Sequence, residues 1–496
     1  MVYPVRTCGS PESGCREGAG KADVLGIPGT TERGHVPLEG RPGEHAAAGA
    51  AWQRWRRAGL TGTSAIAAQV VVMIVGLVST PLAVEYLGKE RYGICLTLSS
   101  MLAWLAISDV GLGGNALVNA IAEAEGRDDR AWQRELVATA FWSLAGIGAF
   151  LGLGVWAALG HVPWRAVFKA SAAVPSGELV TAVAACVALF ALEFPARVAS
   201  TVYYGAQQGY VSNVWNILSN CASLGVLFLV TRRSGGLLQV VLALWGTRVL
   251  FSYLVCASLF GRDRPWLLPV PWAATRRALR RLTSLGVRYV VAQVGGFAMF
   301  QSQPIVIAQL LGPAQVAVFG VAHRLATFPA VLLGGLLNGL MPAYGEARGG
   351  GDWEWIRRTF RGSLAASALL SLGAAGLIVA LLRPAVRLWV GPALDPPLGL
   401  EWALAAYVFL GGIVSPVSVM LYGLERVGKQ ALIAVANGVL VIVLGLLFTP
   451  RYGLTGMAAA MACAIAFTNL PGQFLEASRT LRERSSRARG ATGAGG

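Results

Sequence analysis

Long apolar stretches, separated by short polar connections, run from about residue 60 to residue 475 of this chain. Each is close to the roughly 20 residues that an α-helix needs to cross the hydrocarbon core of a bilayer. The pattern predicts an all-α, polytopic membrane protein with twelve transmembrane helices. The second and eighth are long and carry several polar residues, so we expect each of them either to be broken or to extend into the cytoplasm. The predicted helices are 60–87, 92–121, 136–159, 179–203, 211–230, 237–260, 285–311, 314–341, 364–390, 400–422, 431–448 and 454–475.

Lysine and arginine residues are concentrated in alternate connections. With a cytoplasmic N-terminus, the segments on the cytoplasmic side hold 23 of them and those on the other side hold 9. Since cytoplasmic loops carry an excess of Lys and Arg, this predicts a multi-pass protein of the cell (inner or plasma) membrane with both termini in the cytoplasm. The longest basic connection separates six helices from six. The predicted parts are a tail (1–50), an N-terminal lobe (51–260), a basic cytoplasmic linker (261–283), a C-terminal lobe (284–478) and a basic cytoplasmic tail (479–496).

The composition extends the membrane assignment to most of the chain. The 496 residues are 55% hydrophobic and 13% charged, whereas soluble domains are about 25% charged. The net charge of +16 is spread over short loops, so it does not indicate a nucleic-acid surface. The first 50 residues contain ten Gly and five Pro, cannot bury a core, and are expected to be disordered. Cysteines and histidines are scattered without a CxxC motif, so we expect no metal site, disulfide framework or cofactor.

The two sets of six helices resemble each other in sequence. Residues 80–88 (TPLAVEYLG) end the first helix, and residues 303–312 (QPIVIAQLLG) end the seventh. The fourth and tenth helices end in residues 204–208 (YGAQQ) and 422–426 (YGLER), with the tyrosines 218 residues apart. Because six is an even number, both halves would insert in the same sense. This predicts a pseudo-two-fold axis along the membrane normal, with the substrate path between the halves.

Four arginines lie inside the predicted spans: Arg197, Arg248, Arg288 and Arg324. An ionisable residue at membrane depth is costly and marks a candidate functional site, and four of one sign predict a cavity that binds an anionic group. Two alternatives stay open. Glu193, four residues before Arg197, suits an intrahelical ion pair, and Arg288, near a helix end, can snorkel to the membrane surface. Arg248 and Arg324 have no acidic neighbour at helical spacing, so they are the strongest candidates for cavity cations.

Other polar residues in the spans are candidates for ion coupling or for lining the substrate path. Asp109 is the best candidate for a proton- or sodium-sensitive carboxylate, because burial disfavours its charged form, and Glu193 is the second. The alternatives for Asp109 are a pair with one of the arginines or a packing hydrogen bond. Amide side chains can line a path for a hydroxyl-rich substrate or bond neighbouring helices. These are Gln69, Asn115, Asn119, Gln293, Gln301 and Gln303.

Four short motifs lie next to predicted helix ends or, in one case, within the second predicted helix. They are residues 87–93 (LGKERYG), 108–113 (SDVGLG) followed by 119–122 (NAIA), 204–208 (YGAQQ) and 451–456 (RYGLTG). Together with the helix count, they resemble the polysaccharide transporter (O-antigen flippase) family of the multidrug/oligosaccharidyl-lipid/polysaccharide exporter (MOP) superfamily. The sequence Gln301-Ser302-Gln303 departs from that family, whose members often carry a charged residue in the seventh helix.

The resemblance implies a MATE-like, V-shaped bundle of two six-helix lobes around a central cavity. It implies transport without enzymatic activity: a polyprenyl-pyrophosphate-linked oligosaccharide would move from the cytoplasmic to the periplasmic or outer leaflet, for O-antigen, lipopolysaccharide or another surface polysaccharide. The pyrophosphate would bind the arginines, since guanidinium groups bind phosphate in bidentate fashion. Expected partners are the lipid-linked oligosaccharide, membrane lipid, a polysaccharide polymerase and glycosyltransferases, with no nucleic acid, and the chain is expected to be a monomer.

Two alternative functions fit the sequence less well than the flippase. A cation-coupled multidrug antiporter of the same superfamily would need an acidic cavity, whereas arginines outnumber carboxylates in these helix interiors. A membrane-embedded enzyme would need a large extramembrane loop or a carboxylate pair for a metal, and no DxD motif is present. The sequence therefore favours the flippase, then the antiporter.

Overall fold

The computed structural model describes residues 42–109, 111–232, 235–349 and 351–492. The chain divides into two compact units, Met1–Trp52 and Gln53–Gly496, and all twelve predicted spans lie in the second. The regular structure of the described residues is helical, without strands. The tail expected to be disordered falls largely on residues 1–41, which lie outside the described residues, and helix α1 begins at Pro42.

The described residues form α-helices joined by short turns and by brief 3₁₀ or π segments. The α-helices are α1 (Pro42–Leu105), α2 (Asn115–Gly126), α3 (Arg130–Ala158), α4 (Trp164–Phe168), α5 (Ser176–Gly205), α6 (Gly209–Thr231), α7 (Leu237–Val241), α8 (Thr247–Ser258), α9 (Arg276–Leu311), α10 (Pro313–Asn338), α11 (Leu340–Gly349), α12 (Trp353–Val390), α13 (Leu400–Gly423), α14 (Val427–Ala464) and α15 (Leu470–Thr492). The short segments are η1 (Ala106–Asp109), η2 (Leu242–Gly246), η3 (Leu259–Asp263), η4 (Pro265–Leu267), η5 (Pro271–Ala273), η6 (Pro392–Leu394) and η7 (Ile465–Asn469).

Ten stretches of the described residues are long and apolar enough to cross a membrane. Two of them are about twice the usual length, Leu60–Asp109 with 50 residues and Gly428–Arg482 with 55. Each contains a glycine outside the helical conformation, Gly88 and Gly453. The chain reverses at Gly453, because a Cβ on Gly456 would lie 2.3 Å from a carbonyl oxygen eight residues earlier. With two crossings for each long stretch, the structure is consistent with the twelve predicted helices.

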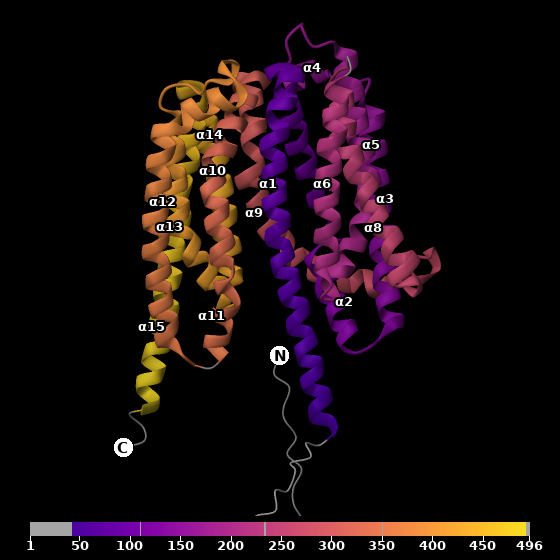
Figure 1. Cartoon of the computed structure of the whole chain (residues 1–496), viewed down its shortest axis with the longest axis vertical. Helices are drawn as coiled ribbons and strands as arrows, with labels where there is room; N and C mark the ends of the chain where they lie inside the picture. Colours follow the sequence, from indigo (N-terminus) through magenta and orange to yellow (C-terminus); the bar gives the residue numbers. More distant parts are fainter. Residues whose placement is uncertain (1–41, 110, 233–234, 350, 493–496) are drawn as a thin grey trace, which may run out of the picture. The chain divides into compact units, whose positions relative to one another are not determined.

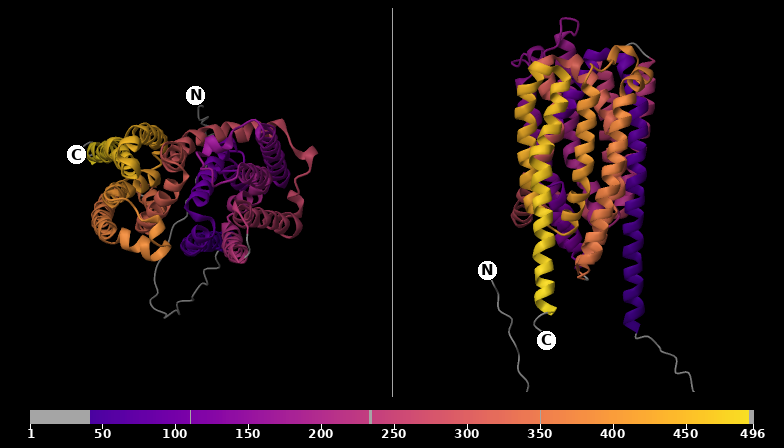
Figure 2. Two further views of the ribbon diagram at one scale, coloured as in Figure 1. Left: turned by 90° about the horizontal axis from the view of Figure 1, so that it is seen from above. Right: turned by 90° about the vertical axis from the view of Figure 1, so that its left-hand side faces the viewer.

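The helices form two groups. Helices α2 to α8 pack on one another, and α1 is tied to them because the Asn213 amide of α6 donates to the carbonyl of Thr61 at 3.2 Å. Helices α9 to α15 likewise pack on one another, which gives an N-terminal half (53–275) and a C-terminal half (276–482) (Figures 1 and 2). Helix α9 joins them, since it also packs against α2 and α3. We call the end where α4 lies and where α9 and α12 end the glycine end, after Gly312 and Gly391 that cap these two helices. The end with α2 and α11 is called the basic end (Figure 1).

The predicted internal repeat is visible in the backbone conformation. Gly88 and Gly312 end the first and seventh predicted helices with nearly equal dihedral angles, φ 72° and ψ 166° against φ 88° and ψ 165°. Positive φ is a region that glycine enters at little cost, so both helices require glycine there. Gln207 and Glu425, in the two Tyr-Gly motifs, are non-glycine residues with positive φ of 57° and 58°. Equivalent turns therefore recur in the two halves.

The second and eighth predicted helices occupy equivalent positions in the two halves, but only the second is clearly interrupted. Each is followed by an aspartate N-cap, Asp129 and Asp352, whose carboxylate accepts from the amide three residues on at 2.9 Å. The eighth is nearly continuous as α10 and α11. The second is broken between η1 and Asn115, the start of α2. The expected break is thus found in the second helix.

The basic linker leads directly into the seventh helix. Its arginine-rich part, 276–281, forms the first turns of α9 and is capped by the hydroxyl of Thr275, which accepts from the amide of Ala278 at 3.2 Å. Arg281 pairs with Glu123 at 2.9 Å, so this pair holds the start of α9 against α2.

Candidate functional site

Two of the four predicted arginines meet one carboxylate in the N-terminal half. The Arg248 Nε lies 2.9 Å from the Glu193 Oε1, and the Arg197 Nε lies 3.8 Å from the same oxygen. We call Glu193, Arg197 and Arg248 the charged trio; it carries two positive charges and one negative charge. The Glu193 side chain is only 12% exposed, whereas that of Arg248 is 58% exposed. The predicted pair of Glu193 with Arg197 is therefore the looser of two contacts, and the closer partner lies on α8.

Asp109 lies at the break in the second helix and holds its turn. Its carboxylate accepts from the amide of Gly113 at 2.5 Å, and the carbonyl of Gly113 accepts from the hydroxyl of Thr201 at 2.6 Å. Thr201 is one turn beyond Arg197 on α5, so the break lies next to the charged trio. A Cβ on Gly113 would meet the Asp109 carboxylate at 3.4 Å. In this structure Asp109 shapes the backbone of the break.

Arg324 binds helix α1 of the other half. Its Nη1 donates to the Thr80 hydroxyl at 2.7 Å and to the carbonyl of Gly76 at 3.3 Å. A Cβ on Gly76 would lie 3.2 Å from the guanidinium carbon, so the absence of a side chain there lets Arg324 lie against the helix. These hydrogen bonds join the two halves. They direct Arg324 to α1 and not to the charged trio.

A second contact reaches α1 one residue further along. The Trp389 indole Nε1, at the glycine end of α12, donates to the carbonyl of Leu77 at 2.8 Å. Pro81 lacks an N–H, so the carbonyl four residues before it, that of Leu77, lacks its ordinary helical donor. Trp389 supplies that missing donor from the other half. We call the bonds from Arg324 and Trp389 to α1 the latch.

The halves also touch at the glycine end, beside the latch. A Cβ on Gly93 would lie 1.7 Å from the carbonyl oxygen of Pro313, and the Gln309 Nε2 donates to the carbonyl of Val167. Helix ends from both halves are therefore in close contact at this end.

The remaining predicted residues are dispersed. Gln69, Asn115 and Asn119 are exposed, Gln293 and Gln301 are half-buried, and Gln303 is buried and donates to the carbonyl of Met299 within its own helix. Gln293 lies near the break in the second helix, with its Nε2 4.0 Å from the place of a Cβ on Gly114. Arg288 belongs to α9, but its side chain lies outside the described residues. Whether these residues line a substrate path stays a prediction.

A large cavity lies within the C-terminal half. It has a volume of about 1050 Å³, is enclosed by α9, α10 and α12 to α15, and is lined mainly by apolar residues. None of the described arginines is among its lining residues. Its polar contributions include His323, whose ring stacks on Phe319 at 5.5 Å and lies 5.8 Å from that of Tyr407. The sequence did not indicate this cavity, because its walls are ordinary helix interiors.

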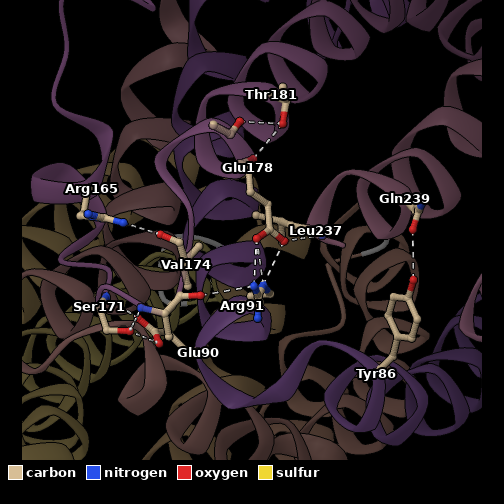
Figure 3. A network of polar contacts seen from close by, with 12 residues as sticks. Tyr86, Glu90, Arg91, Arg165, Ser171, Val174, Glu178, Thr181, Leu237 and Gln239 are labelled. Carbon is tan, nitrogen blue, oxygen red and sulfur yellow. Dashed lines mark hydrogen bonds and ion pairs between the residues drawn. The ribbon is translucent and has the colours of Figure 1, made fainter. Parts of the chain in front are cut away.

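The motif at residues 87–93 forms a polar network at the glycine end of the N-terminal half (Figure 3). The Arg91 Nε and Nη2 bind the two carboxylate oxygens of Glu178 at 2.9 and 3.0 Å, and Glu178 also accepts from the amide of Leu237 at 2.9 Å. Glu90 accepts from the amide of Ser171 at 2.6 Å. The network joins the turn after the first helix to the starts of α5 and α7, so this motif has a structural role.

No group of three or more His, Cys, Asp or Glu side chains placed to hold a metal occurs among the described residues. Residues 61–347, more than half of the chain, match the family described as polysaccharide biosynthesis protein. The chain belongs to this family. No curated protein matches it.

Solved structures similar to this one are transporters. An inward-facing multidrug resistance MATE family transporter of the MOP superfamily has a TM-score of 0.73 at 14% identity, over 84% of this chain and 96% of that one. An outward-facing multidrug resistance MATE family transporter of the same superfamily has a TM-score of 0.61 at 16% sequence identity, over 87% of this chain and 97% of that one. A third similar structure is a MOP superfamily transporter from Pyrococcus furiosus, described as having a binding pocket of reverse polarity. Its TM-score is 0.61 at 15% sequence identity, over 87% of this chain and 97% of that one. The MATE-like fold predicted from the sequence is confirmed.

Proposed function

We propose that this protein is a flippase that moves a polyprenyl-pyrophosphate-linked oligosaccharide from the cytoplasmic to the periplasmic or outer leaflet by alternating access. Membership of the polysaccharide biosynthesis family, combined with a transporter fold, is the observation that carries the proposal. The family indicates glycan assembly, and the fold indicates movement across the bilayer.

The charged trio suits the pyrophosphate of such a substrate. One carboxylate shared by two arginines leaves a net positive charge in a span. Arg248 is bound to Glu193 through its Nε and is 58% exposed, so its terminal nitrogens are placed to bind a phosphate oxygen pair. Guanidinium groups bind phosphate in this bidentate manner and keep their charge. Glu193 orients the two arginines for the substrate.

The latch suits one state of an alternating-access cycle. The positive-inside pattern favours a cytoplasmic basic end. In that orientation, the latch and the contact of Gly93 with Pro313 close the outer side. The higher TM-score with the inward-facing transporter, 0.73 against 0.61 with the outward-facing one, agrees with this state. Substrate release to the outside would require the latch to open.

The test uses a deletion strain complemented by variants. Lipid extracts are analysed for polyprenyl-pyrophosphate oligosaccharide, and surface polysaccharide is measured in parallel. The proposal expects the intermediate to accumulate in the deletion strain and in Arg248→Ala, and to return to normal with wild type or with Arg232→Ala, an exposed arginine of the same half that lies on Phe228. Normal intermediates with altered drug tolerance would instead favour the cation-coupled multidrug antiporter.

A further inference from the structure

The segment that leads into α9, residues 264–275, carries an inference that does not depend on the transported substrate. We call it the connecting segment. It contains η4 and η5, and both short helices pack on α3. In Figure 1 it follows α8 and projects at the side of the N-terminal half. Its depth in the bilayer follows from the residues of α3 that it contacts.

The connecting segment contacts α3 where the charged residues of that helix end. Thr275 donates through its hydroxyl to the Glu135 carboxylate at 2.9 Å and through its amide to the Thr139 hydroxyl at 3.0 Å. About one turn further along α3, the Trp142 indole Nε1 donates to the carbonyl of Pro269 at 3.0 Å. Glu135 is the last charged residue of α3, and the helix is apolar enough to cross a membrane. The segment therefore lies at the level where α3 enters the hydrocarbon region.

The connecting segment also covers the lipid-facing side of α3. With 3.6 residues in a turn, Trp142, Leu153 and Trp156 lie on one side of the helix, and Leu153 and Trp156 are 66% and 70% exposed. Helix α3 lies at the edge of the N-terminal half far from α12 (Figure 1), so this exposed apolar side faces lipid. Thr139, on the same side nearer the basic end, is buried, because the segment lies on it. The outer surface of the segment is thus next to lipid.

The composition of that outer surface suits an interface between lipid and water. Every exposed residue from 264 to 280 is apolar or an arginine. Trp272 and Leu268 are 80% and 52% exposed, and tryptophan is enriched at membrane–water interfaces. Arg276 and Arg280 lie one turn apart on α9, on the side opposite the buried Ala278. Within the described part of the chain, neither of these two arginines has a hydrogen bond or an ion pair.

We infer that residues 265–280 bind the headgroup layer of the leaflet at the basic end, with Leu268 and Trp272 inserted and with anionic phospholipid on Arg276 and Arg280. Guanidinium groups match phosphate oxygens. Apolar and basic residues together are typical of segments that lie in the membrane interface, and basic residues beside a span attract anionic lipids. A soluble protein could contact the arginines, but it would not insert beside the lipid-facing side of α3. The lipid contact would anchor the start of α9, which joins the two halves.

The first experiment measures the depth of the connecting segment. A bimane label is placed at Trp272→Cys in the full chain without native cysteines, and the protein is reconstituted in nanodiscs. Leu153→Cys serves as the lipid-facing control and Asp128→Cys, whose native side chain is 89% exposed before α3, as the aqueous control. We expect brominated lipid to quench the label at residue 272 and aqueous iodide to leave it largely unquenched. Iodide quenching as strong as at residue 128 would show that the segment is in water and would overturn the inference.

The second experiment measures the lipid preference of the arginines. Wild type, Arg276→Gln and Arg358→Gln are purified in detergent, and bound phosphatidylglycerol or phosphatidylcholine is counted by native mass spectrometry over a range of lipid concentrations. Arg358, an exposed arginine of the same end, pairs with Glu354 at 3.6 Å and is the control. We expect wild type to prefer phosphatidylglycerol, Arg276→Gln to lose affinity for it about fivefold, and Arg358→Gln to keep it within about twofold.

Equal losses in the two glutamine variants would show a general charge effect and contradict the assignment of the anionic lipid to Arg276, as would equal binding of the two lipids by wild type. Arg276→Lys, which keeps the charge, is expected to retain most of the preference. Thermal unfolding of each variant in detergent checks that a loss is not misfolding.

Discussion

The latch predicts a specific coupling between Trp389 and Pro81. In Trp389→Phe the carbonyl of Leu77 loses the donor at 2.8 Å, and Pro81 still cannot supply one from within α1. A net hydrogen bond contributes about 0.5–1.5 kcal/mol, and an unpaired buried carbonyl costs about 1–3 kcal/mol. The latched state should therefore lose about 1–2 kcal/mol, which shifts its population against the open state about 5- to 30-fold.

The coupling between Trp389 and Pro81 is tested by giving the Leu77 carbonyl a donor within its own helix. In Pro81→Ala the amide of residue 81 can bond the carbonyl of Leu77 inside the helix, so the same Trp389→Phe change should then cost about 1 kcal/mol less. Opening is followed by pulsed electron–electron resonance between spin labels at Ala172 and Leu398, exposed positions at the glycine ends of the two halves, in a background without native cysteines. Trp402→Phe, at a tryptophan that is 66% exposed near the same end, is the control. If Trp389→Phe widens the distance distribution equally in the parent protein and in the Pro81→Ala variant, the argument from the freed carbonyl is wrong.

Three further predictions concern the glycine end. Gly93→Ala would place a Cβ 1.7 Å from the carbonyl oxygen of Pro313; the glycine ends can then no longer meet, and the same spin labels should report the open distance only. Arg91→Gln leaves the Glu178 carboxylate, 16% exposed, without its bidentate partner; we expect a loss of about 2 kcal/mol, discounted for partial exposure, seen as a lower midpoint of thermal unfolding in detergent. Hydrogen bonds from Arg387 and Arg383 hold the pKa of Asp395 below its ordinary value. A carboxyl group with a lowered pKa stabilises the folded state at pH values above its unfolded pKa, and this stabilisation is lost as the pH falls through the folded pKa. The turn after α12 should therefore become more sensitive to protease in acid, and its protease sensitivity should not change between pH 6 and 8.

Features that depend on local sequence were predictable, and features that depend on distant partners were not. Helix positions follow from apolar length alone, and the equivalence of Gly88 and Gly312 follows from their motifs, because a glycine that ends a helix leaves a local signature. The spacing of Glu193 and Arg197 indicated their contact. It could not indicate that Arg248, 55 residues from Glu193, would be the closer partner.

The latch illustrates the same limit. Pro81 inside an apolar helix signals a carbonyl that needs a donor, and this much is readable from the sequence. The donor is Trp389, 312 residues from Leu77, and nothing in the local pattern of either residue selects the other. Arg324 stands out in the sequence for its charge at membrane depth, and in this structure that charge is directed to a hydroxyl and a carbonyl of α1.

Equivalent residues of the internal repeat show how the charged trio and the cavity of about 1050 Å³ come to lie in different halves. The Tyr-Gly turns fix the offset between α5 and α13 at 218 residues, which makes Gly411 the equivalent of Glu193 and Ser415 the equivalent of Arg197. Both of these C-terminal residues line the cavity of about 1050 Å³. The same place in the scaffold therefore holds an ion cluster in one half and an open, mainly apolar space in the other, because the long charged residues of one half correspond to small residues in the other. Two identical halves could offer a substrate only one kind of surface twice. The divergence leaves one half with an ion cluster of net positive charge and the other with a mainly apolar space. In the flippase proposed above, these two places would meet the anionic head and the hydrocarbon tail of the substrate.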